Sequence, residues 1–272
     1  MSDSVISISR PEGEAADLIA PTTTDQKLDD LIVDDSVKGA LKRGIEEQSH
    51  LSEIMSQGLR PQRTFLFTGP PGCGKTMAAS VIANALHLPL FTVRLDAIIT
   101  RYLGESSQKL RAVFTAIEQS RAVYLFDEFD SLGLERGSAQ DVAEMRRVLN
   151  SFLVFVESFG GNSLVVAATN HAESLDFALF RRFDALIEFE MPTAEQCLLA
   201  LQSRLKGVQT PKSVDLEEVA DAAHGLSFAD LARVVDDSLK WVIIGHSKTL
   251  STSLLLEAVN RRKDFLSKNR RV

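Results

Sequence analysis

Residues 69–76 read Gly69-Pro70-Pro71-Gly72-Cys73-Gly74-Lys75-Thr76 and fit the pattern G-x-x-x-x-G-K-[ST]. The apolar run Phe65-Leu66-Phe67 precedes this stretch, and Met77 begins the run of mostly apolar residues that follows it. This order predicts a strand, a tight turn and the start of a helix, which is the context that makes the pattern informative. The stretch therefore indicates an α/β fold in which a glycine-rich loop leads directly into a helix.

The glycine-rich loop has the chemistry of a phosphate-binding site. Its three glycines allow the backbone to curl so that several N–H groups point inward, and the following helix adds the positive end of its dipole. Lys75 can reach the β- and γ-phosphates of a nucleotide, and the Thr76 hydroxyl can ligate Mg²⁺. A glycine-rich turn without a ligand is the alternative, and the strand and helix on either side disfavour it.

Composition indicates a folded chain with one large domain or two modest ones. The 272 residues are 44% hydrophobic and 25% charged, which is ordinary for a soluble protein. Cys73 and Cys197 fit neither a metal-ligand spacing nor a disulfide framework, so we expect a reducing cytoplasmic compartment. No run approaches the roughly 20 apolar residues of a spanning helix, and the N-terminus has no signal pattern, so no membrane association is expected.

Negative charge is concentrated near the N-terminus. Residues 1–36 hold nine acidic and two basic residues, which accounts for the whole formal net charge of −7. The remainder is neutral overall, so a basic nucleic-acid face is not indicated. Residues 1–24 are acidic and rich in Ser, Thr and Pro, and we expect a flexible N-terminal arm there. The locally basic stretch 261–271 favours a solvated terminal helix.

Short apolar segments alternate with amphipathic helices through the first two thirds of the chain. The predicted helix 105–119, for example, places Leu110, Val113 and Ile117 on one face. Such alternation is typical of a parallel sheet between helices, so we expect a Rossmann-like α/β domain with a five-stranded parallel sheet over residues 25–191. The expected strands are 64–68, 90–94, 123–127, 164–169 and 185–190.

After Pro192 the sequence indicates helices alone. Thr193 and Gln196 form a capping-box pattern, and Asp215, Ser227 and Ser251 each precede a further helical pattern. Residues 192–272 are therefore expected to form a small all-helical lid domain.

Two carboxylates follow the expected strand at 123–127. Asp127 would hold Mg²⁺, and Glu128 would orient and deprotonate an attacking water molecule. An apolar run that ends in acids is a weak signal alone, but it gains weight beside a phosphate loop in the same domain.

Further polar residues lie between the last two expected strands, 164–169 and 185–190. Asn170 ends the strand 164–169, where an uncharged side chain could hydrogen-bond a γ-phosphate or a water molecule, although a strand-ending Asn is often only a turn residue. Arg181 and Arg182 precede the last strand. Arginine suits the spread charge of a transferring phosphoryl group, and a surface pair bonded to nearby acids is the alternative.

Together these segments resemble an AAA ATPase module, of the branch that includes spastin and katanin. The resemblance covers nearly all of residues 25–272. Residues 69–76 match the Walker A motif, 123–128 the Walker B motif, Asn170 the sensor-1 asparagine and 175–184 the arginine-finger segment. In this family the arginines act in trans on the ATP of the neighbouring subunit, which implies a homo-oligomeric ring, usually a hexamer.

The resemblance implies two loops that would grip a threaded polypeptide. Tyr102, Leu103 and Gly104 match the aromatic-aliphatic-glycine step of pore loop 1, although an aromatic residue there could also anchor the core. Residues 133–141 occupy the place of pore loop 2, with weaker support.

The adenine end of the site departs from the family pattern. Residues 225–231 resemble the segment Gly-x-Ser-Gly-Ala-Asp beside the base, with Ala229 in register and Phe228 replacing the second glycine. The Ile-Gly-Gly segment of the family is poorly matched, and Ile32 and Val33 are expected to line the pocket.

The expected function is that of a cytoplasmic ATPase that uses ATP and Mg²⁺, assembles into a ring and unfolds or threads protein substrates. A separate adaptor or protease is an expected partner. Two other classes stay open: a nucleic-acid-linked AAA loader, which the acidic charge balance disfavours, and a slow regulatory ATP switch for a partner enzyme.

Overall fold

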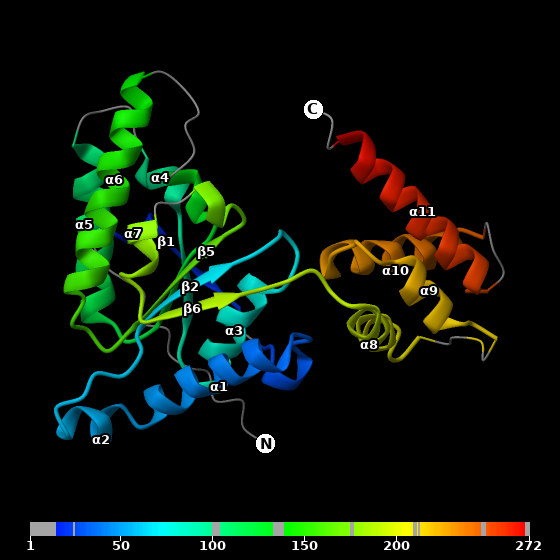
Figure 1. Cartoon of the computed structure of the whole chain (residues 1–272), viewed down its shortest axis with the longest axis horizontal. Coiled ribbons are helices and arrows are strands. Elements are labelled where there is room, and N and C mark those ends of the chain that lie inside the picture. Colours follow the sequence, from blue (N-terminus) through cyan, green and yellow to red (C-terminus); the bar gives the residue numbers. More distant parts are fainter. Residues whose placement is uncertain are drawn as a thin grey trace. The chain divides into compact units, whose positions relative to one another are not determined.

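The computed structural model describes residues 15–23, 25–99, 104–132, 139–174, 177–208, 211, 213–245 and 249–269 (Figure 1). The chain divides into two compact units. Met1–Gly69 with Lys75–Phe189 form the α/β unit, and Pro70–Gly74 with Glu190–Val272 form the helical unit.

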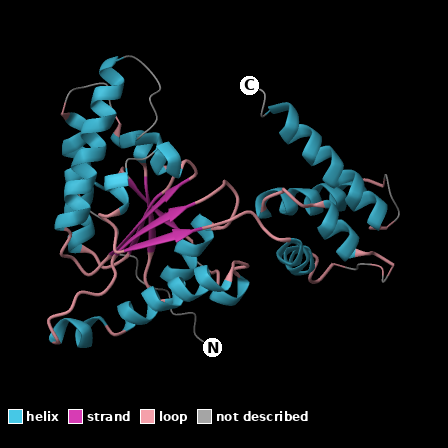
Figure 2. Cartoon of the chain, in the orientation of Figure 1, coloured by secondary structure: helices cyan, strands magenta, loops and turns pink. Residues whose placement is uncertain are grey.

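The described part of the α/β unit contains one six-stranded sheet with the order β1-β3-β4-β5-β2-β6 (Figure 2). Five strands run parallel, as the sequence predicts, and β2 lies between β5 and β6 with every residue buried. Burial on both faces explains why β2 is apolar without alternation. The strands are β1 (Ile19–Thr22), β2 (Thr64–Thr68), β3 (Leu90–Val93), β4 (Val123–Phe126), β5 (Leu164–Thr169) and β6 (Ala185–Glu188).

Strand β1 corrects the prediction for the N-terminal region. Ile19 pairs with Val93 in an antiparallel register, and Leu18 and Ile19 are both buried against the edge of the sheet. Residues 15–23 are therefore not part of a flexible arm, as predicted for residues 1–24, and the sheet has six strands rather than five. The burial of apolar side chains offsets the cost of ordering this short segment.

Helices cover both faces of this sheet. In Figure 1, α5 and α6 lie on one side of it, and α1 and α3 lie on the other. The helices of this unit are α1 (Asp35–Ser49), α2 (Leu51–Ser56), α3 (Lys75–Ala85), α4 (Leu95–Ile98), α5 (Glu105–Gln119), α6 (Ala139–Ser158) and α7 (Phe177–Phe180), with short 3-10 turns η2 (Leu28–Asp30), η3 (Phe129–Leu132) and η4 (Ala172–Ser174).

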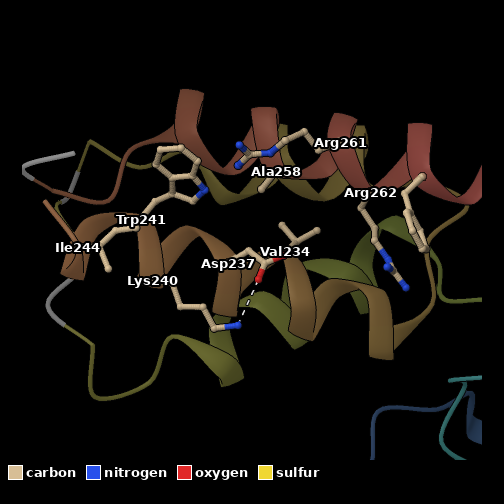
Figure 3. A pocket seen from close by; sticks show the side chains of 9 residues that line it. Val234, Asp237, Lys240, Trp241, Ile244, Ala258, Arg261 and Arg262 are labelled. Atoms are coloured by element: carbon tan, nitrogen blue, oxygen red, sulfur yellow. Dashed lines mark hydrogen bonds and ion pairs between the residues drawn. The ribbon is translucent and has the colours of Figure 1, made fainter. Parts of the chain in front are cut away.

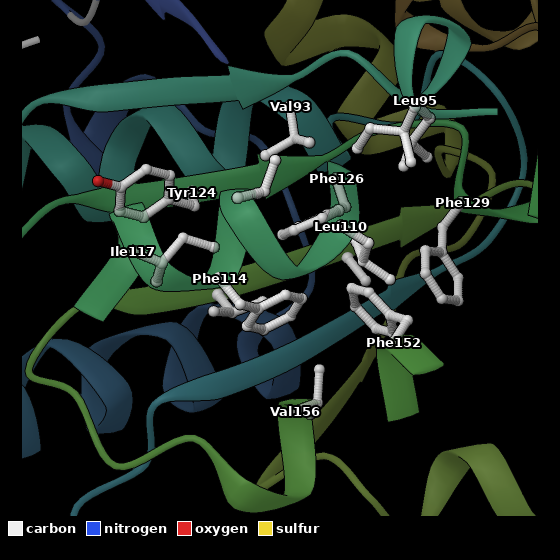
Figure 4. Packing of buried hydrophobic residues seen from close by; sticks show 14 of the residues in the cluster. Val93, Leu95, Leu110, Phe114, Ile117, Tyr124, Phe126, Phe129, Phe152 and Val156 are labelled. Atoms are coloured by element: carbon white, nitrogen blue, oxygen red, sulfur yellow. The ribbon is translucent and has the colours of Figure 1, made fainter. Parts of the chain in front are cut away.

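An aromatic cluster fills the space between the sheet and helices α5 and α6 (Figure 4). The Phe152 ring lies 4.6 Å from that of Phe129, 5.0 Å from that of Phe126 and 5.6 Å from that of Phe114, measured between centroids. Phe126 and Phe129 flank the two carboxylates after β4. The core therefore fixes the backbone on both sides of those carboxylates.

The helical unit contains α8 (Ala194–Arg204), α9 (Leu216–Ala222), α10 (Phe228–Ile243) and α11 (Thr252–Asn269). The predicted capping box of Thr193 and Gln196 is present, and Asp215 and Ser227 cap α9 and α10 as expected. Leu201, Val235 and Leu255 belong to a separate buried core. Among the helices of the described residues, none combines the length and apolar composition needed to cross a bilayer.

Candidate active site

The carboxyl ends of three neighbouring strands carry the phosphate loop and the polar residues predicted to act with it. Strands β4, β5 and β2 are adjacent in the sheet. The phosphate loop follows β2, Asp127 and Glu128 follow β4, and Asn170 follows β5. Because parallel strands share their carboxyl edge, these residues lie at one edge of the sheet, where ligands bind in open α/β folds.

The start of the phosphate loop has no room for a side chain. Gly69 has a φ of 129°, and a Cβ there would lie 1.9 Å from the carbonyl oxygen of Phe189. Gly72 and Gly74 also have positive φ angles, of 77° and 101°. Lys75 is buried, and its Nζ donates to the Gly69 carbonyl at 2.6 Å. The lysine that is predicted to bind phosphate is therefore held against the loop.

Thr76 and Asp127 meet directly. The Thr76 hydroxyl donates to Asp127 Oδ2 at 2.8 Å, and Asp127 Oδ1 accepts the backbone N–H of Glu128 at 2.9 Å. Glu128 is exposed and has a φ of 51°, which is uncommon for a residue other than glycine. In the turn after β4, hydrogen bonds therefore hold the Asp127 carboxylate in place, whereas the Glu128 carboxylate is exposed.

The Thr76–Asp127 pair fits the chemistry of Mg²⁺, which prefers oxygen ligands and usually keeps several water and phosphate ligands. The part of the chain that the structure describes holds no group of three or more His, Cys, Asp or Glu side chains suited to a metal ion. Two protein oxygens beside a triphosphate are the arrangement typical of Mg²⁺-nucleotide sites.

Asp130 is a buried acid beside the candidate site that the sequence reasoning missed. It is 7% exposed, and its Oδ1 accepts the Thr169 hydroxyl and the Asn170 backbone N–H, both at 3.2 Å. Asp130 thereby joins the turn that carries Glu128 to the end of β5 that carries Asn170. The signal in the sequence is its place two residues after Glu128.

The middle of the phosphate loop belongs to the helical unit. The Gly72 carbonyl accepts the N–H of Ala229 at 3.3 Å, and the Cys73 thiol donates to the sulfur of Met191 at 3.7 Å. Cys73 is buried. The loop therefore contacts the first turn of α10 as well as the chain just before α8.

The residues expected near the base have the following positions. Ile32 and Val33 are half-buried between η2 and α1, and Ala229 is exposed in the first turn of α10. Phe228 is half-buried and packs against the core of the helical unit. The Phe228 ring, which replaces the second glycine of the family segment, therefore packs within the helical unit.

Arg181 and Arg182 lie in the turn after α7, and both are exposed. Arg182 pairs with Glu157 at the end of α6. No hydrogen bond or ion pair joins Arg182 to the phosphate loop within the described residues. Tyr102 and Leu103 lie outside those residues, whereas Gly104 is described as the residue before α5, with a φ of 83°.

A glycine-rich loop between β2 and α3, followed by acids at the end of β4, defines a P-loop nucleoside triphosphatase. Comparison with known proteins narrows this class. The sequence profile of the ATPase family associated with various cellular activities (AAA) matches residues 65–191. The uncharacterized AAA family ATPase y4kL of Sinorhizobium fredii is 36% identical over 86% of this chain and 70% of its own length.

Other relatives are longer proteins. The ATP-dependent zinc metalloprotease FtsH of Sulfurovum sp. is 31% identical over 95% of this chain, which spans 40% of that protein. The ATP-dependent zinc metalloprotease YME1 homolog of Schizosaccharomyces pombe is 32% identical over 81% of this chain, which spans 31% of that protein. The chain therefore belongs to the AAA family and is an ATPase. Its assignment to the spastin and katanin branch stays a prediction.

Proposed function

We propose that this ATPase assembles into a homo-oligomeric ring, with six subunits as the expected number, and uses ATP hydrolysis to unfold or thread protein substrates. The observation that carries the catalytic part is the Thr76–Asp127 hydrogen bond of 2.8 Å beside the exposed Glu128. It joins the phosphate loop to the acids of β4, as a shared metal-nucleotide site requires.

In the proposed mechanism each residue has one role. The loop N–H groups and Lys75 bind the β- and γ-phosphates. Glu128 accepts a proton from a water molecule, whose oxygen attacks the γ-phosphorus in line with the bond to the β-phosphate oxygen. That bond breaks, and ADP and inorganic phosphate leave. Asn170 orients the water, and its backbone is held by Asp130.

Mg²⁺, when bound, would neutralise the charge that develops on the phosphate oxygens. Thr76 and Asp127 are the residues that would hold it. Their mutual hydrogen bond holds the two oxygens close together.

Arg181 and Arg182 are proposed to act on the nucleotide of a neighbouring subunit. Their exposure supports such a role, because a residue that acts in trans must lie at a surface. The Arg182–Glu157 pair would have to open for that purpose. Both side chains are partly exposed, at 39% and 59%, so this ion pair is of the weak surface kind.

Protein substrates are proposed from the relatives. FtsH and the YME1 homolog are named ATP-dependent zinc metalloproteases, so each couples ATP to proteolysis. We propose that this chain supplies the ATP-driven part of such a reaction, with Tyr102 and Leu103 at the channel and with a separate protease or adaptor as partner.

The variant Glu128→Gln tests the catalytic proposal. It should bind ATP as tightly as the wild type and hydrolyse it about 10²–10⁴-fold more slowly, because the amide cannot accept the proton. Equilibrium binding of a fluorescent ATP analogue and steady-state phosphate release measure the two effects. Glu173→Gln, which changes another exposed acid, is the matched control. Turnover by Glu128→Gln at the rate of this control would contradict the role of Glu128.

A further inference from the structure

Two neighbouring arginines on α11 have different surroundings. Arg261 pairs with Glu257 at 3.4 Å and lies over the ring of Trp241. Arg262 instead reaches α10, where its Nε and Nη2 both lie 2.7 Å from Asp230 Oδ1. The side chains of Arg262 and Asp230 are only 18% and 13% exposed. Figure 3 shows the two guanidinium groups pointing in different directions.

Asp230 uses its second oxygen to cap α10. Oδ2 accepts the backbone N–H of Ser227 at 3.1 Å and the Ser227 hydroxyl at 2.7 Å. Burial alone would raise the pKa of Asp230, but hydrogen bonds from Ser227 and Arg262 together hold that pKa below its ordinary value. One charged carboxylate therefore connects the arginine of α11 to the residue that begins α10.

The capped turn is in close contact with the phosphate loop. Ala229 donates its N–H to the Gly72 carbonyl at 3.3 Å. A Cβ on Gly72 would lie 2.6 Å from Ser227 Oγ and 2.8 Å from Ala229 Cβ. These distances show that the turn packs directly against Gly72, so a displacement of Ser227 changes the packing around Gly72.

We propose that Arg262 is a positioning residue for nucleotide binding. Through Asp230 and the Ser227 cap, it holds the Gly72 segment in the conformation that binds phosphate. The proposal rests on the binding of nucleotide phosphate by loop 69–76. Without Arg262 the buried Asp230 carboxylate loses its cation, so it must take up a proton or turn toward water. Either change loosens the cap and the loop that contacts it.

A purely structural role is the competing explanation, because Arg262 also joins α10 to α11. In that case its loss would lower the stability of the helical unit and leave nucleotide affinity unchanged. The full-length chain carrying Arg262→Gln separates the two explanations. Arg261→Gln is the matched control, because Arg261 lies on the same helix, carries the same charge and has its guanidinium on Glu257 and Trp241.

The measurements are the Kd for a fluorescent ADP analogue, kcat and KM for ATP, and the thermal melting curve. Arg262→Gln should raise both Kd and KM about tenfold, within the range usual for coupled sites, and change kcat less than about twofold. Arg261→Gln should match the wild type. Arg262→Lys keeps the charge but not the contact of two nitrogens with Asp230, so its Kd and KM should lie between those of Arg261→Gln and Arg262→Gln.

A Kd for Arg262→Gln equal to that of Arg261→Gln would overturn the proposal. If Arg262→Gln does not fold, the double variant Asp230→Asn with Arg262→Gln decides, because it leaves no unpaired buried charge. Wild-type Kd in that variant would also overturn the proposal. Lys75→Ala serves as the reference for the loop itself. Unchanged nucleotide binding by Lys75→Ala would refute the phosphate-loop assignment rather than the role of Arg262.

Discussion

At the scale of single residues, backbone conformation is most restricted where the site chemistry is proposed. Glu128 has a φ of 51°, and Gly69 has a φ of 129° with the Phe189 carbonyl oxygen 1.9 Å from the place that a Cβ would take. A non-glycine residue in the left-handed region costs about 1–2 kcal/mol. Such strain is commonly retained at functional sites. The backbone conformation of Glu128 therefore lowers the stability of the folded state while it places the Glu128 carboxylate at the candidate site.

Gly69→Ala should abolish ATP binding and destabilise the protein, because its Cβ would lie 1.9 Å from a backbone oxygen that cannot move freely. We expect a loss above about 3 kcal/mol in the free energy of unfolding, in the range of strong backbone strain. Gly39→Ala in α1 is the control, because no atom lies within 4 Å of the place that its Cβ would take. That change should stabilise by about 0.5–1 kcal/mol. Chemical denaturation measures the free energy of unfolding of both variants. Equal changes in Gly69→Ala and Gly39→Ala would refute the argument that position 69 has no room for a side chain.

At the scale of elements, the aromatic cluster links the core to the site. Phe152 on α6 contacts Phe126 and Phe129, which lie on either side of the two carboxylates. Packing of α6 therefore fixes the position of the turn that carries Asp127 and Glu128. We therefore expect changes in α6 to affect catalysis, although this helix supplies no predicted catalytic residue.

Phe152→Ala should lower the free energy of unfolding by about 3–5 kcal/mol, since it leaves a cavity in a closely packed core. It should also lower kcat in the protein that remains folded. Val154→Ala lies two residues away on the same helix, with 61% of its surface exposed, and should change stability by less than about 0.5 kcal/mol. Urea denaturation and steady-state ATPase assays test the pair. A cost at Phe152 no larger than that at Val154 would contradict the packing argument.

Acid should weaken the cap of α10. The pKa of Asp230 is lowered in the folded chain, so the folded state favours the charged form. Its contribution is complete above the unfolded-state pKa of about 3.9 and is lost as the pH falls from there through the lower folded pKa. The stability difference between the wild type and Asp230→Asn should be constant near neutral pH and shrink below about pH 4. Thermal melts across this range would detect it, and a difference that persists at the acidic end would argue against this role for the charge.

Local patterns in the sequence predicted most of these elements. The five parallel strands, the helix over 105–119 and the caps at Thr193 and Ser227 each depend on neighbours within a few residues. Strand β1 was missed because it is four residues long and takes its stability from pairing with β3, some 70 residues away in the chain.

In the candidate site, too, the sequence predicts local motifs but not contacts between distant residues. The phosphate loop and the acids of β4 are contiguous motifs, so the sequence alone predicts them. Asp130 and Arg262 form hydrogen bonds with residues on other elements, Asn170 and Asp230, and sequence spacing carries no information on those contacts. The basic stretch 261–271 was expected to be solvated, whereas Arg262 is largely buried.

At the scale of the whole molecule, the proposed activity requires more than one copy of the chain. Arg182 pairs with Glu157 within its own α/β unit, and no hydrogen bond or ion pair joins it to the phosphate loop among the described residues. If these arginines complete an ATP site, the site belongs to a neighbouring subunit. A heterologous interface of this kind forms a ring when the rotation between neighbouring subunits closes, and such a ring is the assembly proposed for this chain.

Mixing two inactive variants tests most directly whether the ATP site is shared between neighbouring subunits. One variant is Glu128→Gln, and the other combines Arg181→Ala with Arg182→Ala. In a randomly mixed ring, a subunit with intact Glu128 lies beside one with intact arginines at about a quarter of the sites, as follows from a head-to-tail interface. We predict that the mixture regains about that fraction of wild-type ATPase activity, whereas each variant alone stays inactive. A mixture as inactive as its components would contradict a site shared between subunits.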